Sequence, residues 1–206
     1  MIVILDYDMG NIGSIKNMLK LITKTPVVIT NDKDIIKQAD KLILPGVGAF
    51  DAGINNIKKL DLMDSIYEHA VQKKKPILGI CLGMQLLGID SEEGTEKGLA
   101  LIPFHTRYFS NICNPQLKIP HMGWNYVEIH QKNDPLTKEL SENERYYFVH
   151  SYYATCEEQE NVLMTCNYGS SFAAAVKKEN IYGVQFHPEK SHKYGMKLLK
   201  NFVMEV

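Results

Sequence analysis

Nearly continuous apolar runs alternate with segments of helical spacing through the first half of the chain. Such runs are typical of parallel strands that are covered on both faces, and apolar residues three and four positions apart predict helices between them. The alternation predicts an α/β fold, with an open mixed, mostly parallel sheet, helices on both faces and function at the carboxyl ends of the strands. The predicted strands are Ile2–Leu5, Pro26–Thr30, Lys41–Leu44 and a run from Pro76; the predicted helices lie at 12–22, near 35–39 and at 52–72, the last broken near Leu60.

The second half of the chain has a different pattern. Glycines, prolines, aromatic residues and short apolar runs between Ser91 and Asn133 predict small antiparallel strands and long loops. We find no repeat, low-complexity tract or linker between the halves, so we expect a single domain over residues 1–206 with a small antiparallel extension. Further strands are predicted at Arg145–His150, Asn161–Tyr168, Ser171–Val176 and Ile181–Phe186, followed by a helix through Met196 to Val203.

Composition narrows the classes of function. Hydrophobic content of 45% and charged content of 23% are ordinary for a globular domain, and a net charge of −1 gives no electrostatic basis for binding nucleic acid or an acidic membrane. The four cysteines, at positions 81, 113, 156 and 166, have neither a Cys-x-x-Cys pair nor metal-ligand spacing. We therefore expect reduced thiols in a cytoplasmic protein, without metal or cofactor. We expect no signal peptide before the first strand, and no run approaches the ~18 apolar residues of a membrane helix.

One cysteine has the sequence context of a catalytic nucleophile. Cys81 follows the apolar run Pro76–Leu78, lies between Gly79 and Gly83, and precedes an apolar helical run. A strand, a sharp turn and a helix can hold a nucleophile at the end of a sheet, and glycines avoid a Cβ clash in such a turn. The N-terminus of the following helix would favour a thiolate. The alternative is a buried structural cysteine, a common role for a free thiol.

A histidine near the end of the chain is a candidate base for that nucleophile. His187 ends the predicted strand Ile181–Phe186, and Glu189 follows two residues later. In extended backbone the two side chains point to the same side, so Glu189 can orient the ring and stabilise its protonated form. A histidine beside a cysteine can take up its proton and donate one to a departing amine, as covalent acyl transfer requires. We expect surface or structural roles for the other six histidines, at 69, 105, 121, 130, 150 and 192.

The segment Pro45–Phe50 is a candidate oxyanion loop. It follows a predicted parallel strand, and its glycines, Gly46 and Gly48, would let backbone N–H groups turn toward a neighbouring nucleophile. An ordinary turn containing glycine and proline is the alternative. The segment lacks the Gly-x-x-x-x-Gly-Lys-Ser pattern of a nucleotide phosphate loop.

Two stretches, Gly79–Leu87 and Gln185–Glu189, resemble class I (triad-type) glutamine amidotransferases. Further motifs resemble, more narrowly, the HisH family, the glutaminase subunits of imidazole glycerol phosphate synthase, in the family's order from residue 2 to near residue 203. The resemblance implies a flavodoxin-like fold and hydrolysis of L-glutamine to glutamate and ammonia. The further motifs are Asp6-Tyr7 with Gly10-Asn11, Pro45–Phe50, Pro120–Asn125 and Tyr147–Tyr152.

The resemblance also implies a role for each catalytic residue. Cys81 is implied as the nucleophile, His187 as the general base and acid, and Glu189 as the partner that orients the histidine. The backbone N–H groups of Gly48 and Leu82 are implied as the oxyanion hole.

A substrate pocket and a protein partner are implied in the same way. Family members form a heterodimer with a (β/α)8 barrel subunit, HisF, which receives the ammonia and completes an imidazole ring in histidine biosynthesis. From the residues alone, Trp124 could equally be a core aromatic residue and Lys190 a solvated charge. The implied substrate-binding residues are Gly46, Gln85 and Ser151, and the implied docking residues are Asn11, Trp124, Asn125 and Lys190.

Two positions depart from the family pattern and keep alternatives open. Asp8 and Phe104 stand where glycine is usual, and both bear on loops that face the partner more than on glutaminase chemistry. An alternative within the class is a paralogous subunit that supplies ammonia for amidination of a bacterial surface sugar. Alternatives outside it are a Cys-His peptidase, a redox-sensing thiol protein and a scaffold with a relic site.

Overall fold

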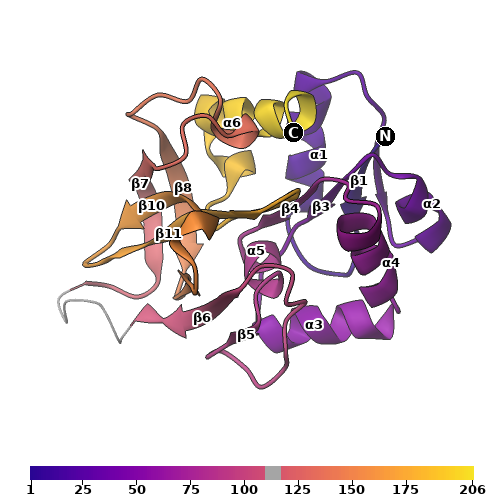
Figure 1. Ribbon diagram of the computed structural model, residues 1–206, viewed down its shortest axis with the longest axis horizontal. Coiled ribbons are helices and arrows are strands. Elements are labelled where there is room, and N and C mark those ends of the chain that lie inside the picture. The colour runs from indigo at the N-terminus through magenta and orange to yellow at the C-terminus, as the bar shows by residue number, and fades with distance from the viewer. Residues whose placement is uncertain (110–116) are drawn as a thin grey trace.

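Figure 1 shows the computed structural model of the chain, which describes residues 1–109 and 117–206. The helices are α1 (Ile12–Ile22), α2 (Lys33–Gln38), α3 (Phe50–Lys59), α4 (Met63–Tyr67), which continues as a π-helical turn over Glu68–Gln72, α5 (Leu82–Leu86) and α6 (His192–Met204). The strands are β1 (Ile2–Leu5), β2 (Val27–Thr30), β3 (Lys41–Leu44), β4 (Ile77–Ile80), β5 (Asp90–Ser91), β6 (Phe104–Tyr108), β7 (His121–Ile129), β8 (Arg145–His150), β9 (Tyr152–Cys156), β10 (Val162–Asn167), β11 (Ser171–Lys178) and β12 (Ile181–Val184).

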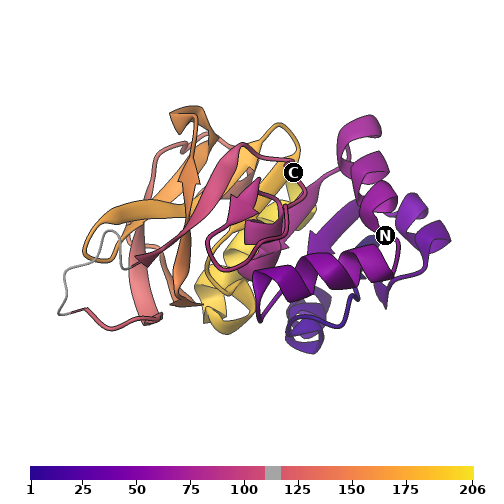
Figure 2. The ribbon, with the colours of Figure 1, turned by 90° about the horizontal axis from the view of Figure 1, so that it is seen from below.

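The strands form one mixed sheet with a parallel and an antiparallel half. Its order is β2-β1-β3-β4-β12-β11-β10-β7-β8, and β9, β6 and β5 branch from β11. Neighbours from β2 to β12 are parallel, whereas neighbours from β12 to β8 are antiparallel. Figures 1 and 2 show the early, indigo-to-purple elements gathered at one end of the molecule and the later strands at the other. The predicted α/β sheet with an antiparallel extension is confirmed.

Helices cover both faces of the parallel half because its strand residues alternate between two buried clusters. In β1, Ile2 and Ile4 belong to a cluster that includes apolar residues of α1 and α6. Val3 and Leu5 belong to the other cluster, with apolar residues of α3, α4 and α5. Figure 1 accordingly shows α1 and α6 on one side of the sheet and α3 and α5 on the other. Burial on both faces explains why these strands read as continuous apolar runs.

Strand β12 joins the two halves and brings distant parts of the chain together. It comes late in the sequence, yet it pairs in parallel with β4, so that Ile181 lies opposite Ile77 and Val184 opposite Ile80. On its other edge it pairs antiparallel with β11. The segments that follow β4 and β12 therefore leave the sheet next to each other, at the carboxyl ends of these two strands.

The structure differs from the predicted elements mainly in the antiparallel half. Strand β9 was missed, because a single residue, Ser151, separates it from β8 and no glycine or proline marks the break. Strand β12 ends at Val184, earlier than predicted. In the first half, the predicted break in the helical segment 52–72 is confirmed, at residues 60–62 between α3 and α4. No helix in the described ranges is long and apolar enough to cross a membrane.

The two departures from the family pattern fit their places in the fold. Asp8 has a φ of 62°, the left-handed conformation that a glycine would adopt without strain. Phe104 begins β6 and is fully buried, with its ring against Gly88, where an added Cβ would lie 2.4 Å from Cε2 of the ring. Asp8 therefore keeps the backbone conformation expected of glycine, and Phe104 adds a buried side chain to the core.

Candidate active site

Cys81 occupies a tight turn between β4 and α5 in a strained backbone conformation. Its φ of 53° and ψ of −110° lie in a region that residues other than glycine rarely adopt. Close backbone contacts explain the glycines on either side. A Cβ on Gly83 would lie 1.8 Å from the Leu44 carbonyl oxygen, and one on Gly79 would lie 2.6 Å from the Gly83 carbonyl oxygen. The turn thus has the form that the sequence predicts, with the side chain of Cys81 projecting from it.

The Cys81 sulfur is nearly buried and lies among polar groups from the other half of the sheet. The side-chain Nε2 of Gln185 donates to the sulfur at 3.7 Å, and the Val149 carbonyl oxygen lies 3.9 Å from it. Helix α5 has only five residues, so its dipole is weaker than that of a long helix. The individual N–H donor of Gln185 is therefore an important source of stabilisation for negative charge on the sulfur.

His187 is fixed by Glu189 and has a raised pKa. Its Nδ1 lies 2.9 Å from Oε1 of Glu189, and both side chains are buried. Since a carboxylate only accepts, Nδ1 carries a proton, and Nε2 has no hydrogen-bond partner in the described parts of the chain. Burial lowers the pKa of His187, but interaction with the Cys81 sulfur and with Glu189 outweighs burial and raises this pKa to about 9. The ring is thus a proton donor near neutral pH.

The contact between His187 and Glu189 runs through a 3-10 turn, whereas the sequence analysis expected extended backbone. Residues Pro188–Lys190 form this turn, with proline at its first position, where the fixed φ of proline suits it. The Ser191 hydroxyl donates to the His187 carbonyl oxygen at 2.6 Å and accepts from the Tyr147 N–H at 2.9 Å. The turn is therefore tied to β8, which fixes the direction of the imidazole.

Cys81 and His187 line one cavity of about 310 Å³ at the carboxyl edge of β4 and β12. Of the other residues singled out from the sequence, Gly48, Leu82, Gln85 and Ser151 also line it. Gly46 does not, because it is packed beneath the loop, where an added Cβ would lie 2.7 Å from the Gly83 nitrogen.

Two residues of the candidate oxyanion loop, Val47 and Gly48, line this cavity. Gly48 has a φ of 115°, which favours glycine, and its neighbour Val47 is 43% exposed although it is apolar. The loop leads into α3, whose first backbone N–H, at Phe50, donates to the Glu93 carboxylate at 2.9 Å. Gly48 and Leu82 therefore line the same cavity as Cys81.

Two residues of the site were missed by sequence reasoning. Glu93 lines the cavity and adds a carboxylate to it; burial raises the pKa of Glu93, which the Phe50 N–H partly offsets. Gln185 is fully buried and bridges Gln85 and Cys81. No local pattern marks Glu93, which lies in a loop. Gln185 could have been found, because a polar residue inside an apolar strand run needs a buried partner.

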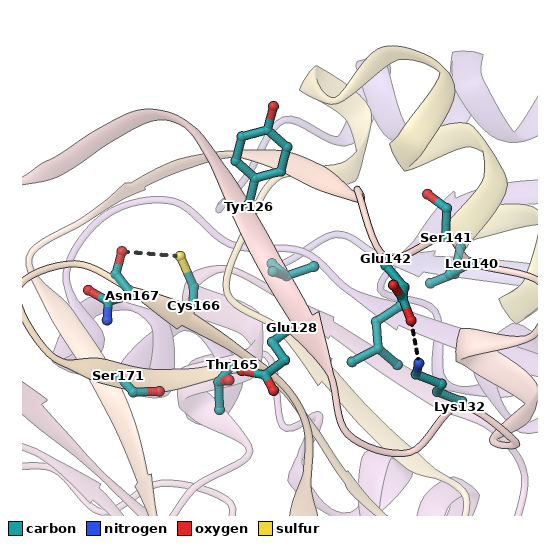
Figure 3. A pocket seen from close by; sticks show the side chains of 12 residues that line it. Tyr126, Glu128, Lys132, Leu140, Ser141, Glu142, Thr165, Cys166, Asn167 and Ser171 are labelled. Atoms are coloured by element: carbon teal, nitrogen blue, oxygen red, sulfur yellow. Dashed lines mark hydrogen bonds and ion pairs between the residues drawn. The ribbon is translucent and has the colours of Figure 1, made fainter.

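A larger groove elsewhere has no comparable chemistry. It has a volume of about 600 Å³, runs between β7, β10 and the 140–142 segment, and has no histidine among the described residues that line it. Figure 3 shows the ion pair between Lys132 and Glu142, 2.8 Å apart, and the Cys166 thiol beside the Asn167 carbonyl. Burial raises the pKa of Cys166 to about 12, so this thiol stays protonated.

In the described parts of the chain, the other thiols and possible metal ligands form no second centre. Cys156 is also free, and burial raises its pKa to about 12. Cys113 lies outside the described residues. Within the described ranges, no group of three His, Cys, Asp or Glu side chains is arranged to hold a metal ion.

Two of the implied docking residues, Trp124 and Lys190, lie against the same ring. Trp124 is 43% exposed, which rules out the interpretation as a core residue, and its ring centroid is 6.4 Å from that of Tyr147. The Lys190 ammonium lies 5.8 Å from the centre of the Tyr147 ring. His192 stacks on Trp124 at 5.6 Å. These side chains form one aromatic and basic surface beside the cavity.

The other two implied docking residues are placed differently. The Asn125 side chain bonds within the chain, to the His121 ring and to the Asn167 carbonyl oxygen. Asn11 is half-buried at the start of α1 and makes no side-chain capping bond, although α1 packs against the turn that carries Lys190. The structure therefore groups Trp124 with Lys190, whereas the Asn125 side chain is engaged with His121 and Asn167.

Comparison with known proteins defines the class first. The profile described as "Glutamine amidotransferase class-I" matches residues 3–206, so the chain belongs to the class I glutamine amidotransferase family. A solved "glutamine amidotransferase" shares the fold, with a TM-score of 0.75 at 16% identity over 98% of this chain and 96% of that one. The structure titled "PurLQS from Thermotoga maritima" is also similar, with a TM-score of 0.74 at 19% identity and the same coverage.

Within the class, relatives of this chain in sequence include HisH subunits. The chain is 56% identical to "Imidazole glycerol phosphate synthase subunit HisH 2" of Methanococcus maripaludis over all of both chains. It is 48% identical to the subunit of the same name from Pseudomonas aeruginosa over 98% of each chain. It is 42% identical to "Imidazole glycerol phosphate synthase subunit HisH" of Leptospira borgpetersenii, again over 98% of each. Identity at this level over the full length places the chain in the HisH family.

Proposed function

We propose that this chain is the glutaminase subunit of an imidazole glycerol phosphate synthase, which hydrolyses L-glutamine and supplies ammonia for histidine biosynthesis. The observation that carries the proposal is the single cavity that Cys81 shares with His187. Full-length similarity to HisH subunits supports it. The unit is one amidotransferase domain over residues 1–206, and the proposed location is the cytoplasm, where a catalytic thiol stays reduced.

In the first half of the reaction, Cys81 forms a covalent intermediate. Its thiolate attacks the side-chain carboxamide carbon of glutamine, and the C–S bond forms as the carbonyl becomes an oxyanion. The backbone N–H groups of Gly48 and Leu82 are proposed to stabilise the oxyanion. His187, protonated below its pKa of about 9, donates a proton to the nitrogen as the C–N bond breaks. Ammonia leaves, and a γ-glutamyl thioester remains on Cys81.

The second half of the reaction regenerates the enzyme. His187, now neutral, removes a proton from a water molecule, and the resulting hydroxide attacks the thioester carbon. The C–S bond breaks, glutamate leaves, and the thiolate and imidazolium are restored. Glu189 keeps Nδ1 of His187 protonated through both steps, so that Nε2 is the atom that exchanges the proton.

The cavity offers charged and polar groups for the α-amino and α-carboxylate groups of glutamine. Gln85 and Ser151 are proposed to bind them, and the Glu93 carboxylate adds a negative charge suited to the ammonium group. Gly46 is proposed to act indirectly, by letting the oxyanion loop pack close against the turn that carries Cys81.

A barrel subunit of the HisF type is proposed to dock beside the cavity and receive the ammonia. Ammonia in neutral water is mostly protonated and no longer nucleophilic, so a sheltered route between subunits is required. In the surface formed by Trp124, Tyr147, Lys190 and His192, Tyr147 is half-buried and the other three residues are exposed. The Tyr147 carbonyl oxygen accepts from the His187 N–H, so this surface adjoins the candidate site. Asn11 and Asn125 are proposed to support this surface from α1 and β7.

The test uses the chain together with the barrel protein that co-purifies with it. We expect weak glutaminase activity of the free chain, stimulation by the partner with its ligand, and conversion of glutamine plus the imidazole precursor nucleotide to the ring product. Incubation with a glutamine-mimicking chloroketone followed by peptide mass spectrometry should label Cys81 and leave a Cys81→Ala variant unlabelled.

Each failure of this experiment has a distinct meaning. Turnover of a surface-sugar precursor in place of the imidazole precursor would overturn the choice of pathway and keep the glutaminase; the names of the relatives do not favour that outcome. Peptide hydrolysis without a partner would indicate a peptidase. Absence of label from Cys81 would overturn the amidotransferase chemistry.

A further inference from the structure

A continuous chain of hydrogen bonds crosses the antiparallel half and ends at the cavity. Asn125 Nδ2 lies 3.2 Å from His121 Nε2, and His121 Nδ1 lies 2.9 Å from His150 Nε2. His150 Nδ1 lies 2.7 Å from the Tyr152 carbonyl oxygen. The same oxygen accepts from Gln85 Nε2 at 3.3 Å. His150, Tyr152 and Gln85 all line the cavity.

The cavity end of this chain determines which nitrogens carry protons. A carbonyl oxygen can only accept, so His150 Nδ1 must carry a proton and donate it to Tyr152. In a neutral ring, His150 Nε2 is then an acceptor, and His121 Nδ1 must donate to it. By the same rule, His121 Nε2 accepts from Asn125. The three bonds from Asn125 to the Tyr152 carbonyl therefore all donate toward the cavity, and that carbonyl also accepts from Gln85.

The Asn125 end of the hydrogen-bond chain independently requires that Asn125 donates to His121. The Tyr126 backbone N–H donates to Asn125 Oδ1 at 2.8 Å, which fixes the oxygen of this amide. Its Nδ2 faces the Asn167 carbonyl oxygen at 3.0 Å as well as His121. Backbone groups on β7 and β10 thus orient the Asn125 amide as a donor to the histidines. Two separate sets of backbone groups agree on one proton arrangement.

The two rings are held in an environment that keeps them neutral and in place. Both are buried, and His121 lies between Phe148 and Tyr168, at centroid distances of 4.8 and 4.1 Å. Phe109 and Phe172 surround His150 at 5.1 and 5.2 Å. Burial lowers the pKa of His121 to about 4 and that of His150 to about 3. Each ring therefore has one proton at neutral pH, as the directional chain requires.

This chain of hydrogen bonds controls the orientation of the Gln85 side chain. The Gln85 Nε2 group donates to the Tyr152 carbonyl and to Gln185 Oε1, the latter at 3.0 Å. Both of its N–H bonds are therefore used within the protein, and Oε1 is the Gln85 atom left to accept from a ligand. An opposite tautomer of His150 would place a lone pair against the Tyr152 oxygen and push away the carbonyl that orients this amide.

We propose that Asn125, His121 and His150 form a directional hydrogen-bond chain that holds the Tyr152 carbonyl and thereby presents the Gln85 amide oxygen to the ammonium group of glutamine. The inference rests on the proposed function, because glutamine is the ligand. His150 is a positioning residue that acts through Tyr152 and Gln85. Asn125 was assigned to docking only by resemblance; here its side-chain amide is the first donor of the hydrogen-bond chain.

The first test reads the tautomers directly in the wild-type protein. Histidine side-chain ¹⁵N NMR at neutral pH should show both His121 and His150 neutral with the proton on Nδ1. A proton on Nε2 of either ring, or a charged ring at that pH, would overturn the proposal. This measurement needs neither substrate nor a variant.

The second test compares two replacements that each keep a different part of the His150 ring. An asparagine amide nitrogen falls near the position of Nδ1, and a glutamine amide falls near that of Nε2. His150→Asn should retain the bond to Tyr152, whereas His150→Gln should lose it. Both remove the same ring from the aromatic cluster, so their loss of packing is matched, and thermal unfolding will show whether both fold.

The readout is the inactivation of Cys81 by a glutamine-mimicking chloroketone, resolved into the binding constant KI and the rate constant kinact. We expect His150→Gln to raise KI about tenfold and His150→Asn to leave it within about twofold, with kinact unchanged in both. His130→Asn, at an exposed histidine of the same sheet bonded to Thr165, is the control and should leave both constants unchanged. Equal KI values for the two His150 variants would overturn the proposal, and if either fails to fold the tautomer measurement decides.

This experiment separates the inference from the proposed function. If Cys81 is labelled but the chain with its barrel partner releases no ammonia from glutamine, the proposed function fails, and the KI comparison still tests the hydrogen-bond chain. If ammonia is released normally and the two His150 variants have equal KI values, the proposed function stands, and the hydrogen-bond chain does not position the substrate.

Discussion

The two halves of the sheet contribute to the candidate site in different ways. In the parallel half, a local turn between β4 and α5 creates the strained position of Cys81, and backbone contacts a few residues away enforce it. In the antiparallel half, the contributing groups come from β8, β9 and the connection after β12, and side-chain hydrogen bonds hold them. One half supplies a rigid nucleophile by steric exclusion, and the other supplies its polar surroundings by pairing.

This difference predicts how the two halves should respond to mutation. A steric arrangement fails when volume is added, because a packed backbone has no room to adjust. A hydrogen-bonded arrangement fails when a donor or charge is removed, and it responds to pH. Strand β12 joins the sterically fixed half to the hydrogen-bonded half, since it pairs with β4 on one side and with β11 on the other.

The largest expected effect is loss of the nucleophile in the parallel half. Cys81→Ala should reduce glutamine hydrolysis on the order of 10⁵-fold, because Cys81 is the only thiol among the described residues that line the cavity. Steady-state ammonia release with the partner present measures this. Cys166→Ala is the matched control: that thiol has a pKa of about 12 and lies in the antiparallel half, so activity should persist. Equal loss in both variants would contradict the assignment.

Adding one methyl group should distinguish a required glycine from a tolerant one. Gly83→Ala should lower the free energy of unfolding by about 3 kcal/mol or more, since its Cβ would lie 1.8 Å from the Leu44 oxygen. Gly13→Ala, in α1 with open space around the new Cβ, should raise it by about 0.5 kcal/mol. Urea unfolding of both variants measures the contrast. A Gly83 variant as stable as the Gly13 variant would show that the turn is not sterically fixed.

Removing the charge of Glu189 should change the pH dependence of both activity and stability. Interactions with the Cys81 sulfur and with Glu189 raise the pKa of His187 to about 9, so wild-type kcat/KM, which reports the free enzyme, should fall as pH rises through about 9. Glu189→Gln should move this limit down by about two units and thereby lower kcat/KM at pH 8 by about tenfold. A kcat/KM profile from pH 6 to 10 measures this, with the exposed Glu128→Gln as control.

The same raised pKa makes a prediction about folding. A group whose pKa is higher in the folded state stabilises the fold fully below its unfolded value, near 6.5, and that contribution disappears as pH rises through about 9. The unfolding free energy of wild type should therefore decline over this window, and that of Glu189→Gln should decline less. Identical slopes would contradict the proposed charge pairing.

The smallest expected effect concerns the exposed surface beside the site. Trp124→Ala should weaken binding of the barrel partner by about tenfold, because an exposed tryptophan framed by Tyr147 and His192 is a typical anchor residue. Titration calorimetry measures the affinity. Met204→Ala removes an apolar side chain that is also exposed, 54%, at the end of α6, and should leave the affinity unchanged. An equal change in both variants would remove Trp124 from the docking surface.

Sequence reasoning succeeded where a feature depends on neighbours along the chain. The strands Ile2–Leu5 and Lys41–Leu44 have the bounds that their apolar runs predict. The glycines at 79 and 83 predict a tight turn, and the structure shows that there is no room for a Cβ at either position. It failed where two elements join without a turn signal, as at Ser151, or where a residue acts through a distant partner. Glu93 and Gln185 belong to the second kind.

The sequence by itself determined the alternating layers of the first half, the tight turn at Cys81 and the family motifs, because local sterics and the period of apolar residues act over a few positions. Only the tertiary structure decided that β12 pairs with β4, that Gln185 lies against Cys81, and that His121 and His150 form one directional pair. These features depend on strand register and on which buried polar groups find each other. Both are properties of the whole packed sheet, because every buried donor in it must be matched to an acceptor elsewhere in the chain.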